Sequence, residues 1–337
     1  MRLERVSAMA LASGVLLALA SVPASGGEPP GDRWQRRCQN LGSTRWIWPQ
    51  GTALWGTHPL RPGDENSGVL AAASLRGVRF GAGELALEGG RLVEKSGKGV
   101  VGTVLRGESS SGRSVDVAIC GEEPVAGEPD MAWYRLQIWN ASSQEWENPC
   151  TGTKDMADPR ALAVAGTWDR AGARSDAPGK ITFACENGAI AKCVRWGYKP
   201  WKTAGGQPVA PLHQACTRMA RADYCGNGTS HTQDATLVDI YDSRGLLART
   251  TSPTARWQPD RASFEAAWGP DGAVCLARTR DDRPVDAILK ECPGRFSRGP
   301  ELDLGDGDRC SLRRDKTGPA GALLRNRSYP ASAARGG

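Results

Sequence analysis

Ten cysteines constrain the folding of this 337-residue chain more than any other feature of its sequence. They lie at Cys38, Cys120, Cys150, Cys185, Cys193, Cys216, Cys225, Cys275, Cys292 and Cys310. An even number of cysteines in an oxidising compartment is typical of a disulfide framework, whereas cytosolic cysteines more often bind metals or catalyse reactions. The compartment therefore decides how these residues are interpreted.

The N-terminus indicates that the protein is exported. Arg2 and Arg5 precede the apolar run AMALASGVLLALA, and small residues around Ala24 follow where a signal peptidase would cut. The run is short for a transmembrane span, so residues 1–24 are predicted to be a cleaved signal peptide; an uncleaved anchor is the alternative. We expect a periplasmic or extracellular protein with up to five disulfides and no membrane span after cleavage.

The composition is that of a globular, loop-rich and strand-rich protein. Hydrophobic residues make up 39% of the chain, which also has 42 glycines and 22 prolines. The net charge is +6, but acidic and basic residues alternate, as in TRDDRP, so no basic stripe indicates nucleic-acid binding. No complete phosphate-binding, dinucleotide-binding or zinc-protease motif is present, and no cofactor is predicted.

Short alternating apolar runs predict antiparallel strands. SVDVAI places Val115, Val117 and Ile119 on one face of a strand, and ELALEGGRLVE predicts a hairpin that turns at Gly89–Gly90. TLVDIYD predicts a later strand, and a Pro-Asp-Gly turn precedes a strand that carries Cys275. The predicted fold class is therefore α+β and β-rich, with antiparallel strands and hairpins, one main helix, and disulfides that staple them.

The main helix is predicted between Pro211, which can open it, and Gly226, which can close it. Apolar residues recur there at helical spacing, at Leu212, Ala215, Cys216, Met219 and Ala222. Just before it, ENGA is predicted to turn a hairpin whose strands carry Cys185 and Cys193.

The helix limits which cysteines can pair. If it runs through Tyr224, Cys216 and Cys225 are about 13 Å and half a turn apart, but a disulfide needs Cα atoms within about 7 Å. They would then pair with Cys185 and Cys193 and clamp the hairpin to the helix. If the helix breaks near Arg221, a local Cys216–Cys225 bond is the alternative.

Four motifs occur in order between Cys150 and Asp242: GTWD (166–169), FACENGAIAKCVRWGYKPW (183–201), ACTRMARADYCGNGTSHT (215–232) and VDIYD (238–242). Together they resemble the bacterial ADYC domain family, named for the tetrapeptide found here at Ala222 to Cys225. The resemblance implies an exported domain of unassigned activity, and it carries over no catalytic residue.

The predicted organisation has five parts. They are a signal peptide (1–24), a linker with a Trp-rich N-terminal segment (25–74), a β-rich region (75–149), an ADYC domain with a C-terminal extension (150–295, core 150–242) and a tail (296–337). The tail is predicted to be disordered because its end is rich in Gly, Ala, Arg and Ser.

The sequence gives little support for a metal site or for a reactive cysteine thiol. Structural zinc sites usually use cysteines two to four residues apart, and the spacings from Cys185 to Cys193 and from Cys216 to Cys225 are longer, so no metal site is predicted. Cys225 lies near the C-terminal end of its predicted helix, where the helix dipole opposes a thiolate, which argues against a cysteine nucleophile.

The catalytic candidates are His231, Asp223 and Asp239. His231 lies in the loop GNGTSHT and could act as a general base with one of the two aspartates. The alternatives are a histidine bonded to the backbone, and an Asp223 that is structural and pairs with Arg218 or Arg221.

Aromatic residues offer a binding hypothesis. The chain has 12 tryptophans, and Trp196, Tyr198 and Trp201 in RWGYKPW could stack on a sugar or polymer if they are exposed. Packing in the core is the alternative for these rings.

The leading hypothesis is a non-enzymatic envelope or extracellular module that binds an unknown protein or polysaccharide partner or serves structurally. The alternative is a secreted hydrolase that uses His231 with Asp239 or Asp223. Whether the protein is an enzyme is therefore open, with the balance against it.

Overall fold

The computed structural model describes residues 30–39, 41–42, 52–153, 156–233, 236–314 and 321–330. The chain separates into two compact units, Met1–Gln35 and Arg36–Gly337. In the first unit only a short helix, α1 (Pro30–Gln35), is described. The predicted signal peptide and much of the predicted linker lie outside the described residues. Everything below concerns the second unit.

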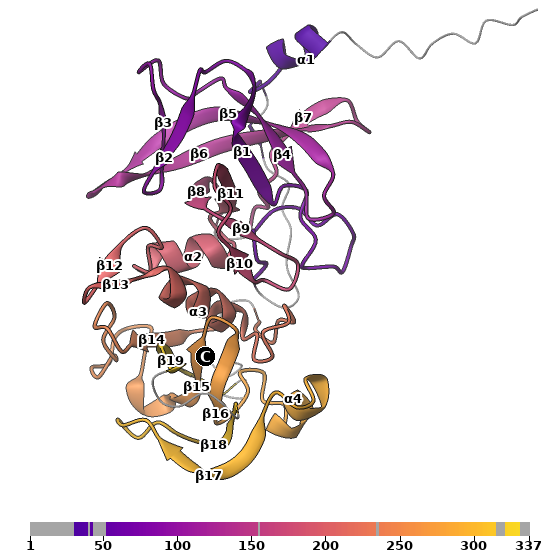
Figure 1. Cartoon of the computed structure of the whole chain (residues 1–337). Helices are drawn as coiled ribbons and strands as arrows, with labels where there is room; N and C mark the ends of the chain where they lie inside the picture. Colours follow the sequence, from indigo (N-terminus) through magenta and orange to yellow (C-terminus); the bar gives the residue numbers. More distant parts are fainter. Residues whose placement is uncertain are drawn as a thin grey trace, which may run out of the picture. The chain divides into compact units, whose positions relative to one another are not determined.

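Six antiparallel strands close into a barrel (Figure 1). Their order is β5-β4-β1-β11-β8-β6, and pairing of β6 with β5 closes the ring, while a short seventh strand pairs with β6 on its other side. The strands are β1 (Ala72–Phe80), β4 (Val104–Glu108), β5 (Ser114–Val125), β6 (Glu128–Asn140), β7 (Glu145–Glu147), β8 (Ala161–Ala165) and β11 (Lys180–Cys185). Closure leaves the barrel strands without free edges.

Alternating side chains fill the barrel. Val117, Ile119, Leu105 and Phe183 belong to one buried cluster at its centre, as the period of two along a strand requires. The hairpin of β2 (Leu85–Glu88) and β3 (Arg91–Glu94) turns at Gly89–Gly90, which confirms that prediction.

A second antiparallel sheet has the order β14-β19-β15-β16-β18-β17. Its strands are β14 (Val238–Asp242), β15 (Ser263–Gly269), β16 (Gly272–Leu276), β17 (Ser297–Asp303), β18 (Arg309–Arg313) and β19 (Leu324–Ser328). The prediction of a disordered tail from residue 296 is therefore wrong where the structure describes it. These strands are short and rich in arginine, so their composition concealed the buried side chains of Leu312, Leu324 and Asn326.

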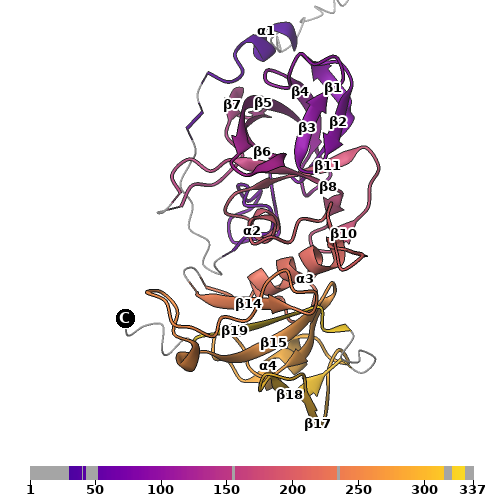
Figure 2. The ribbon, with the colours of Figure 1, turned by 90° about the vertical axis from the view of Figure 1, so that its left-hand side faces the viewer.

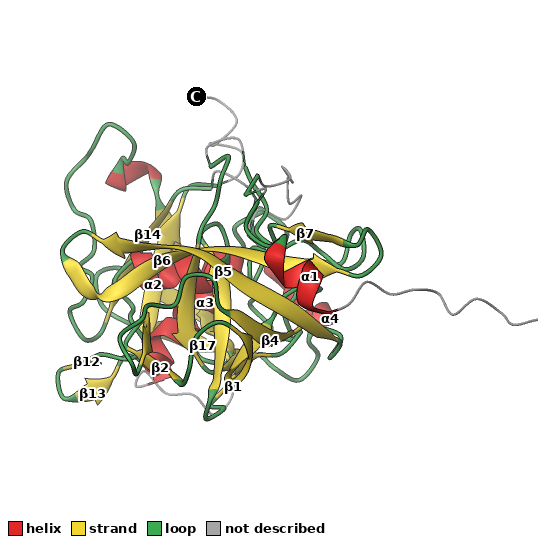
Figure 3. Cartoon of the chain, turned by 90° about the horizontal axis from the view of Figure 1, so that it is seen from above, coloured by secondary structure: helices red, strands yellow, loops and turns green. Residues whose placement is uncertain are grey.

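Helices join the two sheets. Helix α3 (Ala210–Arg221) packs on β15, β16 and β19 and also contacts α2 (Ala189–Arg195), which in turn contacts β11 of the barrel (Figure 2). Helix α4 (Val285–Glu291), the turn η1 (Pro259–Arg261) and two small hairpins complete the elements; the hairpins are β9 (Thr167–Trp168) with β10 (Arg174–Ser175) and β12 (Thr203–Ala204) with β13 (Gln207–Pro208). Most of the described elements are strands, which confirms the β-rich α+β class. Figure 3 shows the strands and helices from above.

Two local predictions differ from the structure. The ENGA turn leads from β11 into α2 and not into a second strand, because the buried Ile190, Cys193 and Val194 recur at helical spacing. Helix α3 ends at Arg221, since Ala222 adopts the left-handed conformation (φ 51°), so Tyr224 and Cys225 lie beyond the helix.

All ten cysteines form disulfides. The bonds are Cys38–Cys120, Cys150–Cys185, Cys193–Cys216, Cys225–Cys292 and Cys275–Cys310. The expected clamp onto the main helix exists at Cys193–Cys216, where it joins α2 to α3. The pairing predicted for Cys185 and Cys225 is wrong, because the early end of α3 turns Cys225 toward the residue after α4, and β11 places Cys185 beside Cys150.

None of the helices in the described part of the chain is long and apolar enough to cross a membrane.

Candidate functional site

Two of the three catalytic candidates, Asp223 and His231, lie in the turn that follows α3 or in the loop after it. The backbone N–H of Ala222 bonds to the carbonyl of Met219, and that of Asp223 bonds to Arg218 O at 2.9 Å. This left-handed ending satisfies helix carbonyls that would otherwise lack a donor. Because it reverses the chain, the next three residues contact different parts of the molecule.

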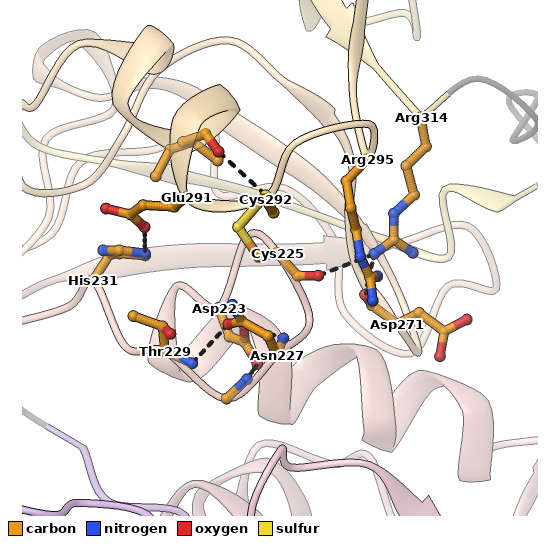
Figure 4. The surroundings of a disulfide bond; sticks show 12 residues. Asp223, Cys225, Asn227, Thr229, His231, Asp271, Glu291, Cys292, Arg295 and Arg314 are labelled. Carbon is orange, nitrogen blue, oxygen red and sulfur yellow. Dashed lines mark hydrogen bonds and ion pairs between the residues drawn. A yellow bond between two sulfur atoms is a disulfide. The ribbon is translucent and has the colours of Figure 1, made fainter.

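Asp223 ties the turn to α3. Its side chain is 1% exposed, and one carboxylate oxygen lies 2.6 Å from Nη1 of Arg218. The carboxylate also accepts the backbone N–H groups of Asn227 and Gly228, at 3.1 and 3.0 Å (Figure 4). The structural alternative for Asp223 therefore describes it well, with Arg218 as the partner.

Tyr224 ties the turn to the six-stranded sheet. Its hydroxyl donates to Glu265 (3.1 Å) and accepts the N–H of Arg280 (2.7 Å), and its ring stacks on Trp268. Burial raises the pKa of Tyr224, and the nearby Glu265 carboxylate raises it further. Burial alone would raise the pKa of Glu265 as well, but the Arg280 guanidinium at 2.9 Å, together with Ser328 and Arg278, lowers it below its ordinary value.

Cys225 and Gly226 complete the turn. Cys225 is bonded to Cys292, just after α4, and its carbonyl accepts a hydrogen bond from Arg314 (Figure 4). A Cβ atom on Gly226 would lie 1.8 Å from the carbonyl oxygen of Asp271, so only glycine fits against the β15–β16 turn.

His231 pairs with a residue that the sequence did not suggest. Its Nε2 lies 2.9 Å from Oε2 of Glu291 on α4 (Figure 4). Its ring also stacks on that of Tyr224. The side chain is only 3% exposed. Burial lowers the pKa of His231, although the Glu291 carboxylate favours protonation.

The third catalytic candidate lies in a different set of contacts. Asp239, on β14, is 2.6 Å from Nη2 of Arg327 and accepts a hydrogen bond from the Thr250 hydroxyl. The bonds of Asp223 go to α3 and its own loop, and its negative charge acts on His231 only as a distant contribution that raises the pKa. Nothing in the sequence around Glu291, 60 residues after His231, marks it as the partner.

The three aromatic candidates do not form an exposed row. Tyr198 is fully buried and its hydroxyl donates to Asp242, so the exposure that stacking requires is absent at this residue. Trp201 is partly buried and donates to Asp130, while Trp196 packs against the cluster around α3. Packing in the core, the alternative for these rings, therefore describes Tyr198.

A polar groove lies on the outer face of the barrel. Two hollows of about 270 and 330 Å³ share Ala72, Glu108, Gly112 and Lys180, so they are continuous. The first lies over β1, β4 and β5, and the second reaches the turn after β9. Sequence reasoning missed this groove because strands that are distant in sequence build it.

The helix that carries the 222–225 turn also holds one wall of the groove. Trp168, which lines the second hollow, donates its indole N–H to Gln214 at 2.9 Å, and Gln214 donates to Gly172 O at 2.8 Å. Arg218 donates to the carbonyl of Ala171. A signal for Gln214 exists in the sequence, since it is a polar residue among the apolar positions of the predicted helix.

A comparison with protein-family models matches the ADYC domain to residues 97–282. The chain belongs to the ADYC domain family. The match starts before the predicted core at 150–242, so the ADYC domain here includes β4–β6 of the barrel as well as β14–β16 of the second sheet. No curated protein and no solved structure matches the chain.

The geometry gives each letter of the ADYC motif a physical role. Ala222 ends the helix, Asp223 bonds its loop to α3, Tyr224 joins the buried network of the sheet, and Cys225 forms a covalent link to the end of α4. Among the described residues no group of His, Cys, Asp or Glu side chains could hold a metal ion.

Proposed function

We propose that this protein is an exported ADYC domain protein that acts by binding a partner and not by catalysis. One observation carries the proposal: the side chains of Asp223, Tyr224, Cys225 and His231 are all buried, and the first three are bonded to their neighbours, while the groove is an open polar surface. A buried side chain that is held by its neighbours suits a scaffold better than a catalytic centre.

Two features support export. The N-terminal sequence has the pattern of a signal peptide. The five disulfides need an oxidising compartment such as the periplasm or the extracellular medium. Which of these two compartments holds the protein depends on the cell that makes it.

Export and oxidation are tested together. The full-length chain with a C-terminal tag is expressed in a Gram-negative host, and the tagged protein is alkylated in denaturant before and after reduction. We expect the mass of a chain shortened near Ala24, no alkylation before reduction and ten alkylated cysteines after it. A full-length chain with freely alkylated cysteines would contradict the proposal.

Binding is tested with the purified oxidised protein, mixed with isolated cell-envelope material and with secreted polymer and followed by sedimentation. We expect saturable binding that is lost when the protein is reduced and unfolded. Absence of saturable binding to every fraction would contradict a binding role.

A secreted hydrolase remains the alternative, with Glu291 now the nearest carboxylate to His231. It finds less support because the imidazole is only 3% exposed and a substrate could hardly reach it. The test is the activity of the wild type and of His231→Gln on chromogenic ester, peptide and glycoside substrates. Hydrolysis by the wild type that disappears in the variant would favour the enzyme.

A further inference from the structure

We infer that the groove on the outer face of the barrel binds an oligosaccharide. This inference rests on the proposed binding function and adds its site and ligand class. The two hollows that form the groove have a combined size within the range of about 300–1,000 Å³ that is usual for small-ligand sites. Their lining, and not their size, indicates the ligand.

Hydroxyl side chains are the most frequent kind in the lining. Six serine and threonine residues contribute to it: Ser74, Ser109, Ser110, Ser114, Thr167 and Ser175. A hydroxyl can both donate and accept a hydrogen bond, and those of Ser109 and Ser110 already bond within the protein. A ligand that presents many groups of the same dual character, as a sugar does, can exchange bonds with them along its whole length.

An ion pair stands where the two hollows meet. Nζ of Lys180 lies 3.1 Å from Oε2 of Glu108, and each side chain is about half exposed. The pair offers a strong acceptor beside a strong donor without a net charge. Two adjacent hydroxyls of one sugar ring could bond to both, and charged partners make such bonds stronger than neutral ones.

The floor of the groove between these groups is apolar, and small side chains line part of it. Ala71 and Ala72 line it, and the largely buried rings of Trp55 and Trp168 contribute to the second hollow. Small side chains leave room for a ring to approach, and the edges of the indoles offer apolar surface. A sugar ring has one face of C–H groups that matches such a floor.

The walls favour this ligand over a peptide or a nucleic acid. The barrel is closed, so an extended peptide finds no free strand edge there to pair with. The charges are balanced, because Lys180 pairs with Glu108, Arg170 pairs with Asp64, and the other two charged lining residues, Arg106 and Asp169, are of opposite sign. A phosphate backbone would require an excess of positive charge along the groove.

The wall around Trp168 is held in place before any ligand binds. Gln214 and Arg218 of α3 bond to the indole and to the turn that follows it, as described above, and Arg174 lies over the Trp168 ring. A groove that is already ordered loses little conformational entropy on binding. The ADYC turn lies at the end of the same helix and thus helps to fix the position of this groove wall.

The test is titration calorimetry of the oxidised protein with neutral and uronic-acid oligosaccharides of four to six units. We expect at least one to bind with an affinity that changes little with salt. Lys180→Ala and Glu108→Gln should weaken that binding about tenfold, since each removes a charge-assisted hydrogen bond. The matched controls are Lys95→Ala and Glu84→Gln, an exposed pair of the same chemistry at 2.7 Å away from the groove lining.

A second variant protects the test from folding defects. Ser175→Trp places a large ring at an exposed position of the groove wall, where it should block the ligand without changing the melting temperature. Oligosaccharide binding that none of the three groove variants weakens would overturn the site. Binding to envelope protein but to no oligosaccharide would overturn the ligand class and leave the proposed binding function intact.

Discussion

The carboxylate of Asp223 has three bonds in a place that water hardly reaches. It neutralises Arg218, whose guanidinium is also buried and extends further to the carbonyls of Ala171 and Pro270. Removal of one member of a buried ion pair leaves the other charge without compensation, which costs more than the pair itself contributes.

We therefore predict that Asp223→Asn lowers the free energy of unfolding by about 3–5 kcal/mol. The measurement is urea unfolding of the oxidised protein at pH 7. The control is Asp176→Asn, because Asp176 pairs with Arg174 but is 84% exposed, and exposed pairs contribute little. Equal effects of the two substitutions would contradict the structural role assigned to Asp223.

Histidine protonation should destabilise this protein. His213 is fully buried, its Nε2 lies 3.0 Å from Ile190 O, and burial lowers its pKa to about 4. Burial also lowers the pKa values of His58 and His231, the two other histidines. In all three cases the unfolded chain binds a proton more readily than the folded protein.

For His213 we predict a loss of stability of about 3 kcal/mol as the pH falls from about 6.5 toward 4. The stabilisation is complete above the unfolded pKa and is lost below it, since only the unfolded state gains the proton. Urea unfolding between pH 7 and pH 4 measures this loss. His213→Gln should flatten the curve by that amount, and an unchanged pH dependence in the variant would refute it.

At the scale of elements, α3 holds the molecule together. Through Cys193–Cys216 it is joined to α2, through Gln214 and Arg218 it holds the wall of the groove, and at its end the ADYC turn reaches the second sheet. Loss of its covalent link should therefore affect both stability and binding.

We predict that the double variant Cys193→Ala, Cys216→Ala lowers the free energy of unfolding by about 3 kcal/mol, since the bond closes a loop of 23 residues in the unfolded chain. Guanidinium unfolding measures this effect. The matched control, Cys275→Ala with Cys310→Ala, removes a bond within the second sheet. We expect the control to lose stability but to keep the oligosaccharide affinity that the first variant loses.

Elements that are determined by residues close to each other in sequence could be predicted. The hairpin at Gly89–Gly90 and the strand with Val117 and Ile119 follow from local alternation and turn chemistry. A break of the helix near Arg221 was one of the alternatives, but the sequence did not favour it, because alanine seldom adopts the left-handed conformation and Gly226 is a more obvious terminator. The strands β17, β18 and β19 could not be predicted, because their composition is polar.

The sites were harder to predict than the elements. Buried pairing of Asp223 with an arginine was among the alternatives, since a carboxylate near a helix end needs a partner. The partners of His231 and Cys225 are on and after α4, more than 50 residues away in sequence. The groove combines β1, β4, β5 and β11, and only the strand order β5-β4-β1-β11 of the sheet brings these strands side by side.

At the scale of the whole molecule, buried arginines connect distant segments. Arg221, fully buried at the end of α3, donates to Thr52 O and to Asn66 in the segment before the barrel. Arg280 connects Glu265 of the second sheet to the last carbonyls of α3. Separation of α3 from either neighbour would therefore break hydrogen bonds made by a buried arginine.

We predict that barrel and second sheet unfold in one cooperative transition when the disulfides are intact. Urea transitions followed by tryptophan fluorescence and by far-ultraviolet circular dichroism should coincide. Arg221→Met, which removes the link to Thr52 and Asn66, should separate them. Two separate transitions in the wild type would show that the sheets are independent.

The pairing of the cysteines also sets how far this protein can be stretched. Three bonds close separate loops, and the loop of Cys225–Cys292 overlaps that of Cys275–Cys310 in sequence. The shortest covalent path from Cys38 to Cys310 therefore omits most of the residues between them. Under tension, the segment from Cys38 to Cys310 in the oxidised protein would reach only roughly a quarter of the length that it has in the reduced chain, even after every hydrogen bond had broken. A protein of this kind that is anchored at one end and pulled at the other would extend over a short distance. Its disulfides would then resist further extension.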